Sequence, residues 1–474
     1  MSLAALDTSP AVAAVREALE GVDGWLVGGT IRDALLGRPI EDVDIAFAGE
    51  PEAVARAVAK AAGGPAFPLS DEFGGWRALA RSGGWTCDVS RLQGGSIEAD
   101  LAQRDFSINA MASPLHGGGL IDPQGGQSDL DAGRLRVLGA EAYAADPLRP
   151  LRLVRLAAEL GFAPDATTEA LTAEAAPRIP ETSPERVFAE LRRLMVSSRV
   201  VDGLALSDRL GVTRAVLPEI YELHGVQQSH FHHLDVHDHT VEVLAQQVEL
   251  ESKLEEVFGP DTAALSAVLD EPFADELTRR EALRFGALLH DIGKPATRGV
   301  RDDGRVTFIG HDSVGEEMVS ELCRRLRTSD RLRTFLGALT RHHLVLGFLV
   351  HHTPLSRRAV YTYLRVCSPV EVEVTVLSCA DRLATRGKNA DAAIDAHLAL
   401  AGELMGEALR WRAGGGAPKA PIRGDELAEA LGIDRGPELG KLLAALQEAR
   451  FAGEIETRAE AVELARELSK NAQP

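Results

Sequence analysis

Cysteines are few in this chain of 474 residues, and long hydrophobic runs are missing from it. The four cysteines show no CxxC spacing, which predicts buried or free thiols in a reducing cytoplasm. No segment approaches about eighteen uninterrupted apolar residues, the length that a membrane-spanning helix needs. The N-terminus also has no basic stretch leading into an apolar run, so we expect neither secretion nor membrane insertion.

Aromatic residues are also scarce, at 5% of the chain, whereas alanine, leucine, arginine and glutamate dominate. This composition favours a mostly helical protein. Apolar residues make up 45% of the chain, which is enough for the cores of several compact domains. Positive charge is in deficit, with a formal net charge of −20. The deficit argues against a general nucleic-acid coat protein. It leaves room for RNA binding in one cleft, because affinity follows the local field.

The hydropathy pattern divides the chain into four parts. Residues 1–137 alternate short apolar runs, helices and glycine turns, and they carry the convincing strand signals, at 25–27, 43–46, 77–80 and 85–89. Helical periodicity runs through 138–225, a histidine-rich helical region covers 226–412, and a helical module at 421–474 follows a Gly- and Pro-rich linker. The sequence therefore predicts an α+β fold that is mostly α, with a small mixed sheet in its first part.

The most informative segment of the first part is Trp25-Leu-Val-Gly28-Gly29-Thr-Ile-Arg32-Asp33. Its two glycines let the backbone turn tightly and approach a ligand closely. The helix that follows presents Arg32 and amide donors in its first turns, which suits phosphate oxygens. We therefore predict a phosphate-binding turn here.

Two carboxylates follow the turn, at Asp42 and Asp44. They alternate with Val43 and Ile45 as in a strand, so both carboxylates face one side and both apolar residues face the core. Such a pair beside a phosphate site is what two-metal nucleotidyl transfer needs, because Mg²⁺ ions activate a hydroxyl and neutralise the triphosphate. Asp88, on a further apparent strand, is the candidate third metal carboxylate; the alternative is a solvated aspartate at a sheet edge.

The ordered set Gly-Gly-x-x-Arg-Asp, spacer and Asp-x-Asp resembles the active-site signature of polymerase-β-like nucleotidyltransferases. The resemblance is to the class II tRNA nucleotidyltransferases (CCA-adding enzymes) and bacterial poly(A) polymerases in particular. Arg104-Asp105-Phe-Ser-Ile-Asn109 is similar to a second family motif, in which the arginine helps bind the triphosphate and the aspartate contacts the ribose hydroxyl. Asp146-Pro-Leu-Arg149 is similar to a third motif, in which the two charged residues pair with the base edge of CTP or ATP.

The resemblance implies a catalytic set and a nucleotide-binding set. The catalytic carboxylates are Asp42, Asp44 and Asp88, of which the first two hold Mg²⁺. The nucleotide-binding residues are Gly28, Gly29, Arg32, Asp33, Arg104, Asp105, Asn109, Asp146, Arg149, Arg152 and Arg155.

Three departures from the family pattern bear on nucleotide choice. Gln103 replaces an arginine that contacts phosphate, and Ala145 replaces a glutamate that positions the template arginine. The link from Asp88 to the Arg104 motif is also shorter than the polar loop of family members. Loss of that loop accompanies enzymes that add only CC, so CC and full CCA addition both stay open.

Two later segments extend the resemblance toward an RNA substrate. The run that opens with Ser183-Pro184-Glu185-Arg186 resembles the family's neck helix, and residues 421–442 resemble its tRNA-binding tail. Ordinary helix packing is the alternative for each segment alone. The family's order across all of them favours tRNA as the partner.

A second constellation lies in the histidine-rich region. The histidines and aspartates of this region follow one another on successive apolar helices in an order that resembles the HD metal-dependent phosphohydrolase superfamily. They are His239, His290, Asp291, His311, His342 or its neighbour His343, and Asp381. Imidazoles and carboxylates make a site for a divalent transition metal or Mg²⁺, which polarises water for attack on a phosphate ester. The first two histidines and the two aspartates are the predicted core ligands. The later histidines complete a second metal site or stabilise the phosphate.

The sequence thus predicts a cytoplasmic tRNA 3′-end nucleotidyltransferase that adds CC or CCA from CTP and ATP and has a metal-dependent HD phosphohydrolase activity. Residues 1–137 would be the nucleotidyltransferase head, 138–225 a helical neck with the base template, 226–412 the HD domain and 421–474 a tRNA-binding tail. Two alternatives remain. One is a poly(A) polymerase, and the other is an HD-type RNA-end or nucleotide phosphohydrolase with a relict transferase head.

Overall fold

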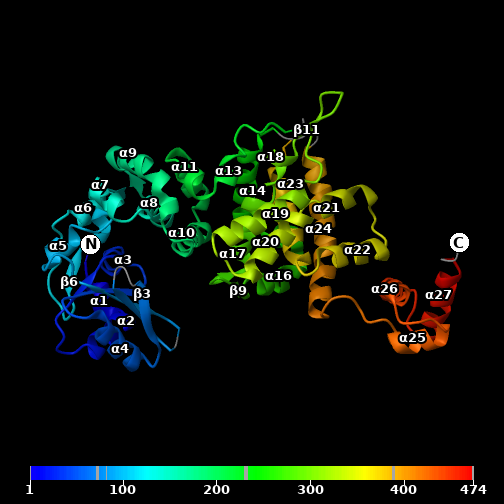
Figure 1. Ribbon diagram of the computed structural model, residues 1–474, viewed down its shortest axis with the longest axis horizontal. Coiled ribbons are helices and arrows are strands. Elements are labelled where there is room, and N and C mark those ends of the chain that lie inside the picture. The colour runs from blue at the N-terminus through cyan, green and yellow to red at the C-terminus, as the bar shows by residue number, and fades with distance from the viewer. Residues whose placement is uncertain (1, 71–73, 82, 229–232, 387–389, 472–474) are drawn as a thin grey trace. The chain divides into compact units, whose positions relative to one another are not determined.

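The computed structural model of the protein describes residues 2–70, 74–81, 83–228, 233–386 and 390–471. The chain divides into two compact units, Met1–Val216 and Leu217–Pro474, coloured from blue to green and from green to red in Figure 1. Helices dominate both units, so the predicted α+β, mostly α class is confirmed. The predicted boundaries near 137 and 421 fall inside these units. The four-part division therefore stays a prediction.

A six-stranded mixed sheet forms part of the first unit, with strand order β3-β4-β5-β2-β1-β6. β2 and β5 pair in parallel, and this register sets Asp44 opposite Asp88. The other neighbouring strands pair antiparallel. All four predicted strands are confirmed. The strands are β1 (Trp25–Val27), β2 (Asp42–Phe47), β3 (Ala66–Ser70), β4 (Gly75–Leu79), β5 (Thr86–Arg91) and β6 (Ala112–Pro114).

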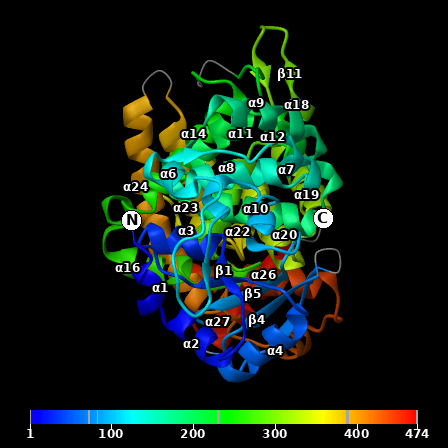
Figure 2. The same ribbon diagram turned by 90° about the vertical axis from the view of Figure 1, so that its left-hand side faces the viewer.

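Helix α4 (Pro51–Ala62) shows how the sequence supports this sheet. Pro51 begins the helix, where its fixed φ suits the first turn. Val54, Ala55 and Val58 recur at helical spacing, are buried, and face β4 and β5. Figure 2 shows α4 beside β4 at the blue end of the chain.

The remaining helices of the first unit precede the sheet, join its strands or follow it. Asp146 caps the C-terminus of α7. Helix α8 begins three residues later, and Pro150 occupies its first turn. A two-stranded pair, β7 (Arg134–Leu135) and β8 (Ala163–Pro164), also lies here. The helices are α1 (Ala4–Thr8), α2 (Pro10–Ala18), α3 (Gly29–Leu35), α5 (Ile97–Leu101), η1 (Ser107–Asn109), α6 (Gly126–Asp131), α7 (Ala140–Ala145), α8 (Arg149–Leu160), α9 (Ala166–Ala175), η2 (Ala176–Glu181), α10 (Pro184–Val196), α11 (Val200–Arg209) and α12 (Val212–Val216).

Helix α17 (Arg279–Leu289) is the buried centre of the second unit. Thr278 and Glu281 start it with a capping box, in which each side chain bonds the backbone of the other residue. Residues 282–289 are all buried, as expected of a helix surrounded by other helices. Its neighbours are α14 (Val236–Leu250), α20 (Asp330–His342) and α23 (Glu371–Ala384), and α20 in turn packs on α19 (His311–Arg325). Figure 1 shows α24 (Ala390–Ala413) in orange beside this group.

Two small hairpins interrupt the region for which only helices were predicted. They are β9 (Pro272–Ala274) with β10 (Leu277–Thr278), and β11 (Gly299–Val300) with β12 (Val306–Thr307). Strands of two or three residues are too short for a period of two to stand out in the sequence. The other helices here are α13 (Pro218–Tyr221), α15 (Leu254–Phe258), η3 (Gly259–Asp261), α16 (Thr262–Leu269), α18 (Lys294–Thr297), α21 (Val345–Leu349), η4 (Val350–His352) and α22 (Arg357–Cys367).

The chain ends in three helices with a core of their own: α25 (Gly424–Leu431), α26 (Pro437–Ala452) and α27 (Arg458–Asn471). Leu427, Leu446 and Ala465 are fully buried in this core. These helices agree with the helical pattern predicted for 421–474, whereas a separate domain there stays a prediction. None of the helices in the described ranges is long and apolar enough to cross a membrane.

Candidate active site and metal centre

The carboxylates predicted from the first motifs lie on the two parallel strands of the sheet. On β2, Val43 and Ile45 are buried while Asp42 and Asp44 point to the other face, which confirms the predicted alternation. Asp88 of β5 is the register partner of Asp44. Three carboxylates from one parallel pair of central strands thus share a face of the sheet.

The glycine turn closes one side of this group. Gly28 has φ +61°, and a Cβ at this position would lie 2.8 Å from Nη1 of Arg104 and 3.4 Å from Oδ2 of Asp44. A side chain here would therefore collide with Arg104, touch Asp44 and strain the backbone. The amide of Gly29, at the start of α3, donates to Oδ2 of Asp44 at 3.2 Å.

The electrostatics of the carboxylates are unfavourable without a cation. Burial, and next the charge of Asp88, raise the pKa of Asp44 from 3.8 to about 6, and Arg104 only partly offsets them. Asp88 itself forms a two-point ion pair with Arg77 of β4, at 2.6 and 2.7 Å. Asp42 accepts a hydrogen bond from the Thr86 hydroxyl at 2.8 Å. The clustered oxygens are a donor set that suits Mg²⁺.

Basic side chains face the carboxylates across a cavity of about 310 Å³. Arg104 is held by Asp100, with Nη2 at 2.9 Å from Oδ2. Arg152 of α8 forms an ion pair with Asp105 at 2.7 Å. Burial alone would raise the pKa of Asp105, but Arg152 and Arg149 outweigh it and hold this pKa below its usual value. Carboxylates and guanidinium groups therefore line one space.

Most of the predicted nucleotide-binding residues meet at this cavity. Those that line it are Gly28, Gly29, Asp44, Asp88, Arg104, Asp105, Asn109, Asp146, Arg149 and Arg152. Within the described residues, Asp42, Arg32, Asp33 and Arg155 do not line it. Arg32 lies behind the glycine turn, where it bonds Asp33 and the side-chain oxygen of Asn109 at 2.8 Å.

Arg155 differs most from its predicted role. Its side chain is 2% exposed and pairs with Glu190 of α10 at 2.5 Å and with Glu159 at 2.6 Å. Glu190 also lies 3.6 Å from Arg152. Arg155 therefore joins α8 to α10 and fixes the helix that carries Arg152, and it does not face the nucleotide cavity.

The predicted base-reading pair lies in the cavity with other partners. Arg149 donates to the carbonyls of Ala142 at 2.9 Å and Gln103 at 3.1 Å. Asp146 forms an ion pair with Arg186 of α10 at 2.6 Å. Both side chains thus have protein partners at the cavity.

The second candidate site is built at helix ends of the second unit. His239 comes from the first turns of α14, and Asp381 comes from α23, 3.1 Å away. His290 and Asp291 directly follow α17, His311 begins α19, and His343 directly follows α20. The ligand atoms fall into two groups, each compact enough for one metal ion: His239, His290 and Asp381, and Asp291, His311 and His343.

Asp291 lies between the two groups. Its Oδ2 is 3.1 Å from Nε2 of His290, whereas its Oδ1 is 3.3 Å from Nε2 of His311 and 3.7 Å from Nε2 of His343. A carboxylate with one oxygen toward each group can bridge two metal ions. The donor set, imidazole nitrogens with two carboxylates, fits a pair of divalent cations.

Backbone carbonyls fix the orientation of three of these imidazoles. The Nδ1 atom of His290 lies 2.8 Å from the carbonyl oxygen of Ala287. The Nδ1 atoms of His311 and His343 each lie 2.7 Å from a carbonyl oxygen, that of Phe308 and that of Thr340 respectively. Because a carbonyl oxygen can only accept a hydrogen bond, Nδ1 carries the proton, and the lone pair of Nε2 is free for a metal. Of the two alternatives that the sequence left open, the second ligand group contains His343 and not His342. That side chain falls outside both groups, since the last turn of α20 turns it away and brings the buried His343 inward.

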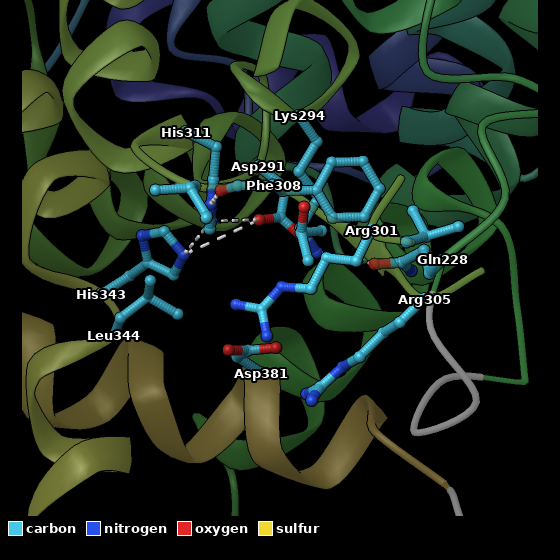
Figure 3. Close-up of a pocket in the computed structure, with 13 residues that line it drawn as sticks. Gln228, Asp291, Lys294, Arg301, Arg305, Phe308, His311, His343, Leu344 and Asp381 are labelled. Atoms are coloured by element: carbon cyan, nitrogen blue, oxygen red, sulfur yellow. Dashed lines mark hydrogen bonds and ion pairs between the residues drawn. The ribbon is translucent and has the colours of Figure 1, made fainter. Parts of the chain in front are cut away.

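Close backbone packing holds the two groups together. A Cβ on Gly293 would lie 2.3 Å from the carbonyl oxygen of His311 and 2.7 Å from the amide of Gly315. The absence of a side chain there lets the loop after Asp291 touch the start of α19. Figure 3 shows Asp291, His311, His343 and Asp381 around one cavity of about 310 Å³.

Comparisons with known proteins match the regions of the chain that carry the two candidate sites. Residues 24–82 and 85–136 match the family described as the Poly A polymerase head domain, 161–223 match the probable RNA and SrmB-binding site of polymerase A, and 236–386 match the HD domain. The A-adding tRNA nucleotidyltransferase of Deinococcus radiodurans is 36% identical over 92% of this chain and 93% of that protein. The CC-adding tRNA nucleotidyltransferase of Thermus thermophilus is 34% identical over 93% and 92%.

The chain belongs to the tRNA nucleotidyltransferase family. Solved structures share the fold at low identity. A CCA-adding enzyme in complex with ATP matches with a TM-score of 0.62 and 20% identity, over 100% of this chain and 96% of that one. The Thermotoga maritima CCA-adding enzyme in complex with tRNA matches with a TM-score of 0.58 and 19% identity, over 99% and 96%.

Three contributors to the sites of this tRNA nucleotidyltransferase family member were missed by sequence reasoning. Arg77 is a cross-strand neighbour of Asp88, a relation that strand register decides. Glu190 anchors the arginines of α8 from another helix. Lys294 lies 2.6 Å from Asp291, and its spacing of one helical turn was a signal available in the sequence.

Proposed function

We propose that the first cavity transfers nucleotides from CTP or ATP to the 3′ end of tRNA. The observation that carries the proposal is the facing of Asp44 and Asp88 with Arg104 and Arg152 across one cavity. A polyanionic triphosphate fits between such walls when cations offset the carboxylates. The complexes named for structural relatives, with ATP, CTP and tRNA, support the same substrates.

The proposed role of each residue follows from its position. Asp42 and Asp44 would hold two Mg²⁺, with Asp88 as the third carboxylate, and the ions would supply charge neutralisation and activation of the hydroxyl. Arg104 and Arg152 orient the triphosphate, and Asp105 accepts a hydrogen bond from the ribose. The terminal hydroxyl of the RNA attacks the α-phosphorus, the bond to the β-phosphate breaks, and pyrophosphate leaves.

The decisive experiment uses a tRNA lacking its 3′ end, incubated with CTP alone, ATP alone or both, and read at nucleotide resolution. Asp44→Asn should lower incorporation at least about a hundredfold, since a metal ligand contributes several kcal/mol to the transition state. The matched control is Asp23→Asn, an exposed aspartate of the same unit. Unchanged incorporation by the Asp44 variant contradicts the proposal, and elongation of an oligo(A) primer in preference to tRNA favours a poly(A) polymerase.

We further propose that the enzyme adds CC and stops. The link from β5 to α5 spans only residues 92–96, which leaves no long mobile loop beside the base. The relatives with restricted activities, A-adding and CC-adding, also match over more than nine tenths of this chain. A tRNA already ending in CC separates the cases: no addition with ATP supports CC addition, whereas one AMP added contradicts it.

For the second cavity we propose metal-dependent hydrolysis of a phosphate ester at an RNA end or nucleotide. Its support is the bridging position of Asp291 between two compact ligand groups. A bound divalent ion would supply an activated water there. Asp291→Asn should abolish hydrolysis of a 2′,3′-cyclic or 3′-terminal phosphate in Mn²⁺ or Ni²⁺ and leave CMP incorporation intact. Loss of hydrolysis in Asp44→Asn instead would contradict a separate site.

We also propose a cytoplasmic location. All four cysteines are buried and free, as suits a reducing compartment.

A further inference from the structure

The hairpin β11–β12 brings two arginines to the rim of the HD cavity. The ladder pairs Gly299 with Thr307 and Val300 with Val306. It continues to Arg301 and Arg305, since the amide of Arg301 donates to the carbonyl of Arg305 at 2.9 Å. Residues directly opposite in an antiparallel pair project to the same face. Both guanidinium groups accordingly line the cavity, and Figure 3 shows Arg301 reaching into it.

Two guanidinium groups on one face of a hairpin favour an anion between them. Like charges directly opposite each other on a ladder are destabilising. Within the described part of the chain, the Arg301 guanidinium forms no ion pair, although acidic residues outnumber basic ones by 71 to 51. Asp303 caps the amide of Arg305 at 3.0 Å, and neither it nor Asp302 lines the cavity.

A different cation already serves the metal ligands. Lys294 is 8% exposed and lies 2.6 Å from Oδ2 of Asp291 and 2.7 Å from the side-chain oxygen of Gln228. It is therefore anchored at the inner end of the cavity, beside the reacting phosphate. Arg301 and Arg305 are exposed and lie at the rim, so the anion they meet is a second one, farther from the metals.

We propose that Arg301 and Arg305 form a subsite for the phosphate that neighbours the scissile one in an RNA 3′ end. The inference rests on the proposed hydrolysis at the HD cavity and deepens it, because it selects an RNA chain over a free mononucleotide. Ile309 also lines the rim and is 77% exposed. It offers an apolar surface for the base between the two phosphates. The open rim lets the rest of the chain continue into solvent.

The test compares hydrolysis by the full-length protein in Mn²⁺ of two pairs of substrates. One pair is a mononucleotide and a tetraribonucleotide that both end in a 2′,3′-cyclic phosphate, and the other pair ends in a 3′-phosphate. The double variant Arg301→Ala, Arg305→Ala should lose about thirtyfold in kcat/KM on the tetranucleotides and less than about threefold on the mononucleotides, since each phosphate contact carries a charge-assisted bond. Its log KM should also depend less steeply on log salt, by about 0.7 for the one lost phosphate contact.

The matched control is Arg298→Ala, which removes an exposed arginine beside the same hairpin that does not line the cavity. Equal losses on both substrate lengths, or an equal loss in the control, overturn the subsite. ATP is assayed as a fifth substrate, and a loss confined to its hydrolysis overturns the RNA assignment in favour of a nucleoside polyphosphate. If the wild-type protein hydrolyses none of these substrates, the proposed phosphohydrolase function itself fails, a result distinct from failure of the subsite.

Discussion

Replacement of Asp44 by asparagine should stabilise the metal-free protein while it destroys nucleotide transfer. Burial and Asp88 raise the pKa of this carboxyl from 3.8 to about 6. A folded-state pKa above the unfolded value means that the native state prefers the protonated form. The stability that this group contributes is complete below pH 3.8 and is lost as the pH rises through 6. At pH 7.5 the charged carboxylate therefore opposes folding.

The magnitude follows from the same values. A rise from 3.8 to about 6 corresponds to at most ~3 kcal/mol, and water in the cavity lowers the expected effect to ~1–2 kcal/mol. The Gly29 amide can still donate to the asparagine oxygen. For a unit of this size we expect the first unfolding midpoint to rise by roughly 3–6 °C.

Tryptophan fluorescence suits the measurement, because Trp25, Trp76 and Trp85 lie in the first unit and only Trp411 lies in the second. Thermal unfolding would be recorded in EDTA at pH 7.5 and pH 5, with Asp23→Asn as the exposed control. The gain should be about half as large at pH 5, which lies between the unfolded pKa of 3.8 and the folded pKa of about 6, and it should vanish below pH 3.8. Mg²⁺ should stabilise the wild type more than the variant. A destabilised variant at pH 7.5, or a gain independent of pH, would refute the reasoning.

Three further predictions follow from the packing around the sites. Gly28→Ala should cut kcat/KM for CTP at least about tenfold, because the new methyl group collides with Arg104. The control Gly37→Ala, with a similar φ but open space around it, should cost only ~1 kcal/mol of stability and no activity. Glu190→Gln should lower the free energy of urea unfolding by about 3–5 kcal/mol, because it leaves a buried guanidinium without its main counter-charge; a change below ~1 kcal/mol would contradict the buried network. His343→Ala should reduce bound metal, measured by mass spectrometry, from two ions to one, whereas His342→Ala should keep both.

Local pattern was enough to predict the chemistry of the first site. The alternation of Asp42 and Asp44 with buried Val43 and Ile45 is a property of any half-buried strand, and it is visible in four letters. The glycine pair marked the turn for an equally local reason, since a positive φ at Gly28 favours a residue without a side chain. The strands and the long helices were predictable because their periods extend over many residues.

Roles that depend on partners from other elements were not predictable in this way. Arg152 and Arg155 lie three residues apart on one face of α8. Glu190 on α10 pairs with the buried Arg155, whereas Arg152 stays at the cavity. The choice between His342 and His343 turned on where α20 ends, and one residue rotates a helical side chain by about 100°. Neither decision is recorded in the local sequence.

The sequence by itself thus determined which chemical groups this protein has and on which strands and helix ends they stand, because backbone periodicity and turn chemistry are local. Tertiary structure alone decided which groups share a cavity. The parallel register set Asp88 opposite Asp44, and a hairpin too short to be predicted set Arg301 and Arg305 at the rim of the HD cavity. Contacts between distant segments depend on packing and register, which no single segment specifies.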